Sequence, residues 1–219
     1  MENIAPLTPV NFFQLQCDCH YLPLQAKKPF GLQANNYSKY LLPDTSALTH
    51  EVHFAEVALG WNEEGMEIYV SINEPFTRSS YPTLDRGDSF EVCIDTRNIK
   101  TSGYNTRFCH HFFCLAEPSD NIHAGEITKF RTEDTHELCD GCDLKVSKTV
   151  KKSSYTLQFL IPAHCLFGYD PEQVGMLGFT YRINRAIGSS QHFSVSSDDY
   201  QFQQQPSLWA SLKLVGRQQ

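Results

Sequence analysis

The strongest constraint on the fold is a run of alternating side chains in residues 87–95, Gly-Asp-Ser-Phe-Glu-Val-Cys-Ile-Asp. Phe90, Val92 and Ile94 fall on one side of this run, as the two-residue period of a β-strand requires. Glu91 and Asp95 fall on the other side. This pattern predicts a central strand that packs one face into the core and carries acidic groups on the other.

Alternating runs of the same kind fill most of the remaining chain. Residues 52–61 and 66–73 are separated by an acidic turn with a glycine, which predicts a hairpin that leads into the central strand. Residues 162–168 begin with Pro and end with Gly and predict one short helical turn. Further strands are expected at residues 106–117, 122–131, 143–150, 155–161, 178–186, 191–195 and 208–215. We therefore predict an all-β protein of about ten strands, a single antiparallel two-sheet β-sandwich of jelly-roll or immunoglobulin-like architecture.

The length of the chain, 219 residues, suits one domain that buries about 70% of the surface of its unfolded state. Residues 1–51 are irregular in pattern, and we expect them to supply an N-terminal edge strand, near residues 11–16, and a segment that wraps the same domain. Residues 52–219 are expected to form the β-sandwich itself.

The charge distribution excludes some classes of partner. Lys and Arg number 18 against 25 Asp and Glu, which gives a net charge of −7. Because phosphate binding needs clustered cations, nucleic acid is not an expected partner. No apolar run approaches the roughly 20 residues that span a bilayer, so membrane insertion is not expected. Residues 1–10 do not have the pattern of a signal peptide, which predicts a cytoplasmic location, with a secreted protein whose leader has been removed as the alternative.

The order of these segments resembles the family 9 carbohydrate-binding modules and the related DOMON-like β-sandwich domains. The resemblance starts with a strand that ends in Trp61, an acidic glycine turn and a strand with Ile68-Tyr69-Val70. A variable loop and the Gly-Asp-Ser-Phe-Glu-Val-Cys-Ile-Asp run follow. Residues 178–185, Gly-Phe-Thr-Tyr-Arg-Ile-Asn-Arg, and residues 206–214, Pro-Ser-Leu-Trp-Ala-Ser-Leu-Lys-Leu, are similar to the last two strands of the family. The resemblance implies a β-sandwich that binds a saccharide without catalysis.

Members of the resembled family clamp a sugar between loop aromatics, with polar groups at its edge. Here Trp61 and Trp209 fall in strands and are expected in the core, so the expected clamp is Tyr81 in the loop of residues 74–86 together with Phe193. Phe193 could equally be a packed strand residue. The predicted ligand-binding residues, including edge donors and the acids that order the site, are Tyr81, Asp88, Glu91, Arg107, Arg182, Asn184 and Phe193.

The acids of the central strand also have a purely structural interpretation. Asp88, Glu91 and Asp95 could form ion pairs and hold loop ends, with Arg107 as a bidentate partner on the neighbouring strand. They could also bind a structural calcium ion through their oxygens. We expect no cofactor, and calcium is the alternative.

Eight cysteines, an even number, invite a search for disulfides or zinc ligands. Cys139 and Cys142 have the spacing of half a zinc site, but a structural zinc site needs four ligands and no matching C-x-x-C exists. Zinc at this pair is therefore disfavoured. His110 and His111 alternate faces, so one strand cannot direct both at one metal. Most of the cysteines are expected to be small buried apolar residues in a reducing compartment.

No motif of a nucleophile elbow, a phosphate-binding loop or a metalloprotease helix is present, so we predict a protein that is not an enzyme. The function predicted is recognition of a saccharide through loop aromatics and a polar sheet face. The alternative is an interaction or scaffold protein that keeps the sandwich without sugar binding, and its partner would be another protein. DOMON-like domains also include haem-binding modules, but methionine occurs only at positions 1, 66 and 176, which disfavours axial haem ligation.

Overall fold

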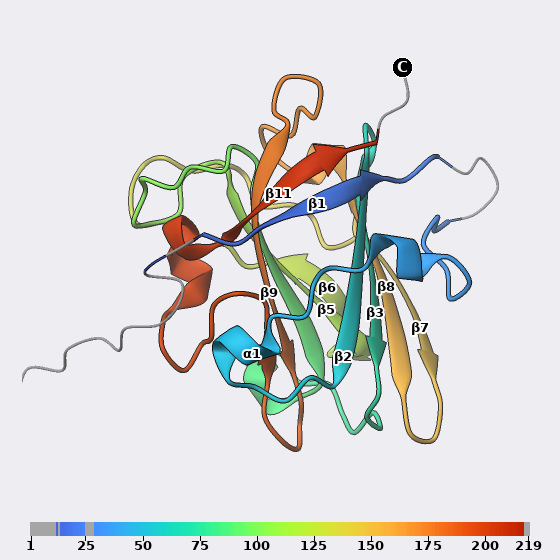
Figure 1. Cartoon of the computed structure of the whole chain (residues 1–219). Coiled ribbons are helices and arrows are strands. Elements are labelled where there is room, and N and C mark those ends of the chain that lie inside the picture. Colours follow the sequence, from blue (N-terminus) through green and yellow to red (C-terminus); the bar gives the residue numbers. More distant parts are fainter. Residues whose placement is uncertain (1–11, 13, 25–28, 217–219) are drawn as a thin grey trace, which may run out of the picture.

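The computed structural model describes residues 12, 14–24 and 29–216 of the chain. Within these residues the protein is almost entirely β-structure, and the only α-helix is the four-residue α1 (Ser46–Thr49) (Figure 1). None of the described helices is long and apolar enough to cross a membrane. The strands are β1 (Gln16–Tyr21), β2 (Ala55–Asn62), β3 (Gly65–Ile72), β4 (Ser89–Asp95), β5 (Cys109–Ser119), β6 (Ile122–Glu126), β7 (Lys145–Val150), β8 (Tyr155–Pro162), β9 (Met176–Asn184), β10 (Gln191–His192) and β11 (Ala210–Val215).

All eleven described strands belong to one hydrogen-bonded sheet, in the order β6-β5-β4-β9-β11-β1-β2-β3-β8-β7, with β10 paired to β9. The sheet curls on itself, and β7 at one end contacts β5 and β6 at the other (Figure 1). The prediction of an all-β fold is confirmed. The prediction of two purely antiparallel sheets needs correction, because the described strands form a nearly closed mixed sheet.

The mixed character comes from β1, which runs parallel to both of its neighbours, β11 and β2. A parallel pair needs a crossover of a dozen or more residues. The segment between the end of β1 and the start of β2 supplies it, and Leu41 forms an isolated bridge with Ala58 on the way. The sequence predicts an edge strand in this N-terminal part, near residues 11–16, of which residues 11 and 13 lie outside the described residues. The described strand begins at Gln16 and lies inside the sheet, between β11 and β2, and not at an edge.

The predicted hairpin forms as β2 and β3, which pair antiparallel along their whole length. Its turn closes at Gly65, whose φ of 140° is a conformation that side chains other than glycine rarely adopt. The final strand is shorter than expected, since residues Pro206–Leu208 form a 3₁₀ turn before β11.

Strand β4 lies between β5 and β9, and its register decides which side chains share a face. Phe90, Val92 and Ile94 belong to the main core, as the alternation predicts. On the opposite face, Glu91 lies directly beside Phe113 of β5 and Arg182 of β9. This second face, which is also largely covered, carries the polar groups discussed below.

The aromatic side chains that the sequence places in strands lie in the interior. Trp61 and Trp209 are buried, and the indole N–H of Trp209 donates to the carbonyl of Phe202 at 2.6 Å. Phe193 is fully buried and stacks on Tyr181 with ring centroids 5.5 Å apart. The core assignment of both tryptophans is confirmed, and Phe193 takes the alternative role of a packed core residue, which leaves its ring no free face for a sugar.

Replacing Phe193 by alanine should lower the free energy of unfolding by about 3–5 kcal/mol, the usual cost of removing a fully buried phenyl ring. Chemical denaturation measures this change. Ile187→Ala is the matched control, since Ile187 is 69% exposed and its loss should stay within about 0.5 kcal/mol of the parent. An unchanged stability in Phe193→Ala, together with a lost saccharide affinity, would place this ring in a binding site instead of the core.

Candidate functional site

The centre of the candidate site is the carboxylate of Glu91, which is almost completely buried on the polar face of β4. Arg182 on β9 donates to its Oε1 from Nε at 2.9 Å and from Nη2 at 2.6 Å. Asn184, two residues further along β9, donates to the same oxygen at 2.6 Å. The ring of His111 on β5 lies with Nε2 2.9 Å from the other oxygen. One buried acid on β4 therefore gathers polar groups from both neighbouring strands, β5 and β9.

The partners of Glu91 decide its ionisation. Burial by itself would raise the pKa of Glu91, because a low-polarity surrounding disfavours the charged form. The hydrogen bonds of Glu91 with His111 and Arg182, together with the positive charge of the Arg182 guanidinium, outweigh burial and hold the pKa of Glu91 at about 2. The acid is thus a permanent anion at neutral pH, and its role is to fix the guanidinium and the imidazole in place.

A pocket of about 310 Å³ opens over this cluster. Glu91, His111 and Arg182 line it together with residues of the loop that precedes β4. Seven of its ten lining residues are polar. The lining residues are Pro82, Thr83, Leu84, Asp85, Glu91, His111, Ile127, Lys129, Arg182 and Gln203.

Two nitrogen atoms of these pocket-lining residues make no hydrogen bond with the described part of the chain. Within the described part of the chain, no hydrogen-bond partner is found for Nη1 of Arg182 or for Nδ1 of His111. The guanidinium also lies over the ring of Phe202, 5.2 Å from its centroid, which limits its motion. Held polar groups at the base of a small concavity can recognise hydroxyl groups of a ligand.

Arg107 is not part of this cluster, contrary to the prediction. The strand that was expected to carry it, β5, begins only at Cys109, and the register places Phe113 beside Glu91. Arg107 is half exposed and forms an ion pair with Asp134 in the loop between β6 and β7. The bidentate partner of Glu91 is Arg182, so the expected pairing of an acid and an arginine exists but on the other neighbouring strand.

Tyr81 lies near the cluster but in a different cavity. Its ring stacks on Phe113 with centroids 5.1 Å apart, and both residues line a larger cavity of about 790 Å³ bordered by residues of β6 and β7. Because Phe193 is buried in the core, the two predicted clamp residues do not face each other.

Asp88 and Asn184 are buried and act on the protein's own backbone and side chains. Asp88 accepts hydrogen bonds from the backbone N–H groups of Thr77, Arg78 and Ala186, and so ties the loop before β4 to the turn after β9. The amide of Asn184 donates to Ser89 as well as to Glu91. The roles of both residues in ligand binding stay predictions, and the contacts favour a supporting role.

The three acids considered for calcium do not share a site. Asp95 accepts from the N–H groups of Arg97 and Ile99, whereas Asp88 and Glu91 have the separate partners described above. Burial raises the pKa of Asp95 in spite of these donors. A calcium ion stays an untested prediction, and these contacts lend it no support.

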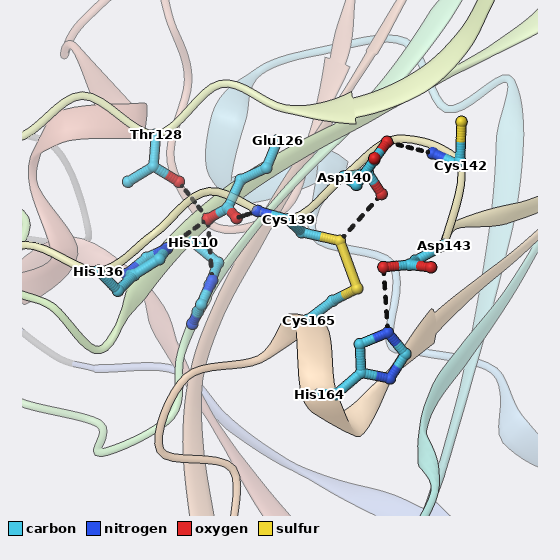
Figure 2. Close-up of a disulfide and its surroundings, with 10 residues drawn as sticks. All are labelled: His110, Glu126, Thr128, His136, Cys139, Asp140, Cys142, Asp143, His164 and Cys165. Carbon is cyan, nitrogen blue, oxygen red and sulfur yellow. Dashed lines mark hydrogen bonds and ion pairs between the residues drawn. A yellow bond between two sulfur atoms is a disulfide. The ribbon is translucent and has the colours of Figure 1, made fainter.

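The cysteines differ from the sequence prediction in one respect, because Cys139 and Cys165 form a disulfide (Figure 2). Cys142 is exposed, and its sulfur points away from that bond. Cys19, Cys93, Cys109 and Cys114 are buried and free, as expected for small apolar residues. Disulfides persist mainly in oxidising compartments, so this bond counts against the predicted cytoplasmic location, which stays a prediction.

Sequence reasoning missed several residues of the pocket. His111 was considered only as a metal ligand, and Asp85, Lys129 and Gln203 gave no signal, because loops carry them to the pocket. A stricter register for β5 would have found His111, since the residue diagonal to Glu91 across the strand pair is two positions before Phe113. The loop of residues 74–86 does line the pocket, as its length suggested.

Comparisons with known proteins agree on the fold. No protein-family model matches the chain, and no curated protein matches it. Among solved structures, a family 9 carbohydrate-binding module from Caldicellulosiruptor kristjanssonii in complex with cellotriose aligns with a TM-score of 0.64 at 16% identity, over 93% of this chain and 95% of that one. The module from the same organism in complex with glucose aligns with a TM-score of 0.64 at 14% identity, over 93% and 97%.

A third structure, described as a putative carbohydrate-binding protein from Bacteroides uniformis, aligns with a TM-score of 0.58 at 7% identity, over 93% of this chain and all of that one. At such identities the likeness concerns the fold. The resemblance to DOMON-like domains receives no support from these comparisons. The chain has the fold of a family 9 carbohydrate-binding module.

Proposed function

We propose that this protein is a non-catalytic module that binds a saccharide in the pocket above Glu91. The observation that carries the proposal is the buried Glu91 carboxylate, which holds the pocket-lining residues Arg182 and His111, each with one nitrogen that makes no hydrogen bond within the described part of the chain. Sugar hydroxyls both donate and accept hydrogen bonds, so a fixed guanidinium N–H and an imidazole nitrogen are suitable partners. Structures with this fold are described with glucose and with cellotriose bound, which supports a saccharide as the ligand class.

The size of the pocket favours a small or terminal sugar. Its volume of about 310 Å³ is at the lower end of the range for ligand pockets, about 300–1,000 Å³. A chain of several sugar units would extend beyond it. We therefore propose that one sugar ring enters, either as a free sugar or as the end of a longer saccharide.

The lining of the pocket differs from an aromatic clamp. Among its lining residues only His111 and Pro82 carry rings, and there is no Trp, Tyr or Phe. A ligand held by hydrogen bonds without a stacking platform is bound more weakly. This feature supports the alternative of an interaction protein that has kept the fold, and the first experiment below distinguishes the two.

Arg182→Lys should lower the affinity for a bound saccharide by more than about tenfold, because lysine keeps the charge but loses the fork that contacts Glu91 and the pocket together. Isothermal titration calorimetry against glucose, cellotriose and a panel of other mono- and oligosaccharides measures the effect. Arg107→Ala is the control, because Arg107 lies outside the pocket. The saccharide affinity of this variant should stay within about twofold of the parent's affinity. Equal losses in both variants would refute the assignment of the site, and no binding to any sugar by the parent would favour the protein-partner alternative.

The stability of the fold should depend on pH through Glu91. The pKa of Glu91 in the folded state, about 2, lies below its ordinary pKa of 4.5. The ionised carboxylate therefore stabilises the fold fully above pH 4.5, and this stabilisation is lost as the pH falls toward the folded-state pKa. Between about pH 6 and about pH 3 this loss amounts to about 2 kcal/mol. In Glu91→Gln this loss of unfolding free energy between about pH 6 and about pH 3 should be absent. Urea unfolding at the two pH values measures it. Glu117→Gln, at an exposed carboxylate, should keep the full acid sensitivity, and the same slope in both variants would contradict the assigned ionisation.

A further inference from the structure

A second buried polar cluster lies on the opposite face of β5 from His111 and is not part of the saccharide pocket. Its members are His110 on β5, Glu126 at the end of β6 and His136 in the loop between β6 and β7, and Figure 2 shows the three side chains converging. The side chains of His110 and Glu126 are completely buried and that of His136 is 2% exposed. A carboxylate buried among polar groups in this way needs strong compensation, so the arrangement calls for an explanation.

The inner nitrogens of both histidines face the same carboxylate oxygen. Nδ1 of His110 lies 2.9 Å from Oε1 of Glu126, and Nε2 of His136 lies 2.8 Å from it. The outer nitrogens face backbone carbonyls, with Nδ1 of His136 2.7 Å from the oxygen of Arg107 and Nε2 of His110 3.4 Å from that of Phe167. Every ring nitrogen of the pair therefore faces an atom that can only accept a hydrogen bond.

A neutral imidazole carries a single N–H. If each ring gives its proton to the carbonyl on the outside, a bare nitrogen lone pair on each ring faces an anionic oxygen on the inside. That contact is repulsive unless a cation lies between the atoms. Metal-bound histidines in proteins have this arrangement, since the outer N–H of such a ring usually donates to a carbonyl or a carboxylate, which fixes the tautomer that binds the ion.

The carboxylate has the supporting contacts that a metal ligand usually has. Thr128 donates from its hydroxyl to Oε1 of Glu126 at 2.7 Å, and the backbone N–H of Cys139 donates to Oε2 at 2.8 Å. The three candidate ligand atoms lie within 4.8 Å of one another, so small shifts would bring them to the bond lengths of about 2.0–2.2 Å that zinc makes with nitrogen and oxygen.

We propose that His110, Glu126 and His136 bind one divalent transition-metal ion of the zinc class. Two imidazoles and one carboxylate suit such an ion better than calcium, which prefers oxygen ligands. The ion would join β5 and β6 to the loop that carries His136. This loop also borders a surface cavity of about 530 Å³ lined in part by His136, Cys139, His164 and Phe167, through which the ion and a water ligand could enter.

The site is distinct from the one at Cys139 and Cys142 that the sequence disfavours. The sulfurs of Cys139 and Cys165 are joined to each other, and the nearby titratable residues include Asp140, Asp143 and His164 (Figure 2). His164 is 65% exposed and lies 3.3 Å from Asp143. It therefore provides a matched control, a histidine of the same region outside the proposed site.

The test uses the full chain. A chelator first removes bound metal, and the chelator is then removed. The protein is titrated with Zn²⁺, followed by calorimetry, and with Co²⁺, followed by absorption spectroscopy. We expect about one ion per chain and a Co²⁺ spectrum with d–d bands of nitrogen and oxygen ligation and no thiolate charge-transfer band. His136→Gln and Glu126→Gln should each lower the affinity by more than about tenfold, because even outer contacts of a metal site contribute about 10–100-fold. His164→Ala should leave it unchanged.

Circular dichroism and thermal unfolding without metal establish that the variants are folded, and Zn²⁺ should raise the midpoint of the parent and of His164→Ala but not of folded His136→Gln or Glu126→Gln. The proposal would be overturned if the parent bound neither ion at micromolar concentrations. It would equally be overturned if His164→Ala abolished binding while His136→Gln and Glu126→Gln kept it, or if a thiolate band showed that the cysteines bind the ion.

Discussion

The arrangement of the polar face depends on the contacts that the buried Glu91 carboxylate makes with its neighbours. A carboxylate removed from water is stable in a protein only when cations and hydrogen-bond donors surround it. The register of β4 between β5 and β9 supplies them, because it brings Arg182 and Asn184 alongside and His111 diagonally across. The same register places Phe90, Val92 and Ile94 in the core, so the apolar and polar faces are fixed by one set of strand pairings.

Adjacent residues of β5 connect the two polar clusters while facing opposite sides of the sheet. His111 contacts Glu91, whereas His110 contacts Glu126. Thr128 bridges them, because its hydroxyl accepts the backbone N–H of His111 at 2.8 Å and donates to Glu126. The segment after β6 also supplies Ile127 and Lys129 to the pocket above Glu91. An ion at the proposed metal site would thus order a segment that forms part of the pocket wall.

The fold could be predicted further than the site. The alternation of β4 and the hairpin of β2 and β3 are local patterns, and the structure confirms them together with the buried Trp61 and Trp209. The position of β1 between β11 and β2 depends on a long crossover, which no local pattern reveals. The partner of Glu91 was expected at Arg107 because the start of β5 was placed too early. The convergence of His110, Glu126 and His136 joins residues from two strands and a loop, which sequence spacing alone does not bring together.

The central claim is that a sugar contacts the free nitrogens of Arg182 and His111. The most direct measurement is nuclear magnetic resonance of their ¹⁵N-labelled side chains during titration with glucose or cellotriose, with the Arg107 side chain as an internal reference. The account predicts that the signals of Arg182 and His111 shift with saturation while that of Arg107 does not. Saccharide binding detected by calorimetry while the side-chain signals of Arg182 and His111 stay unchanged would contradict it.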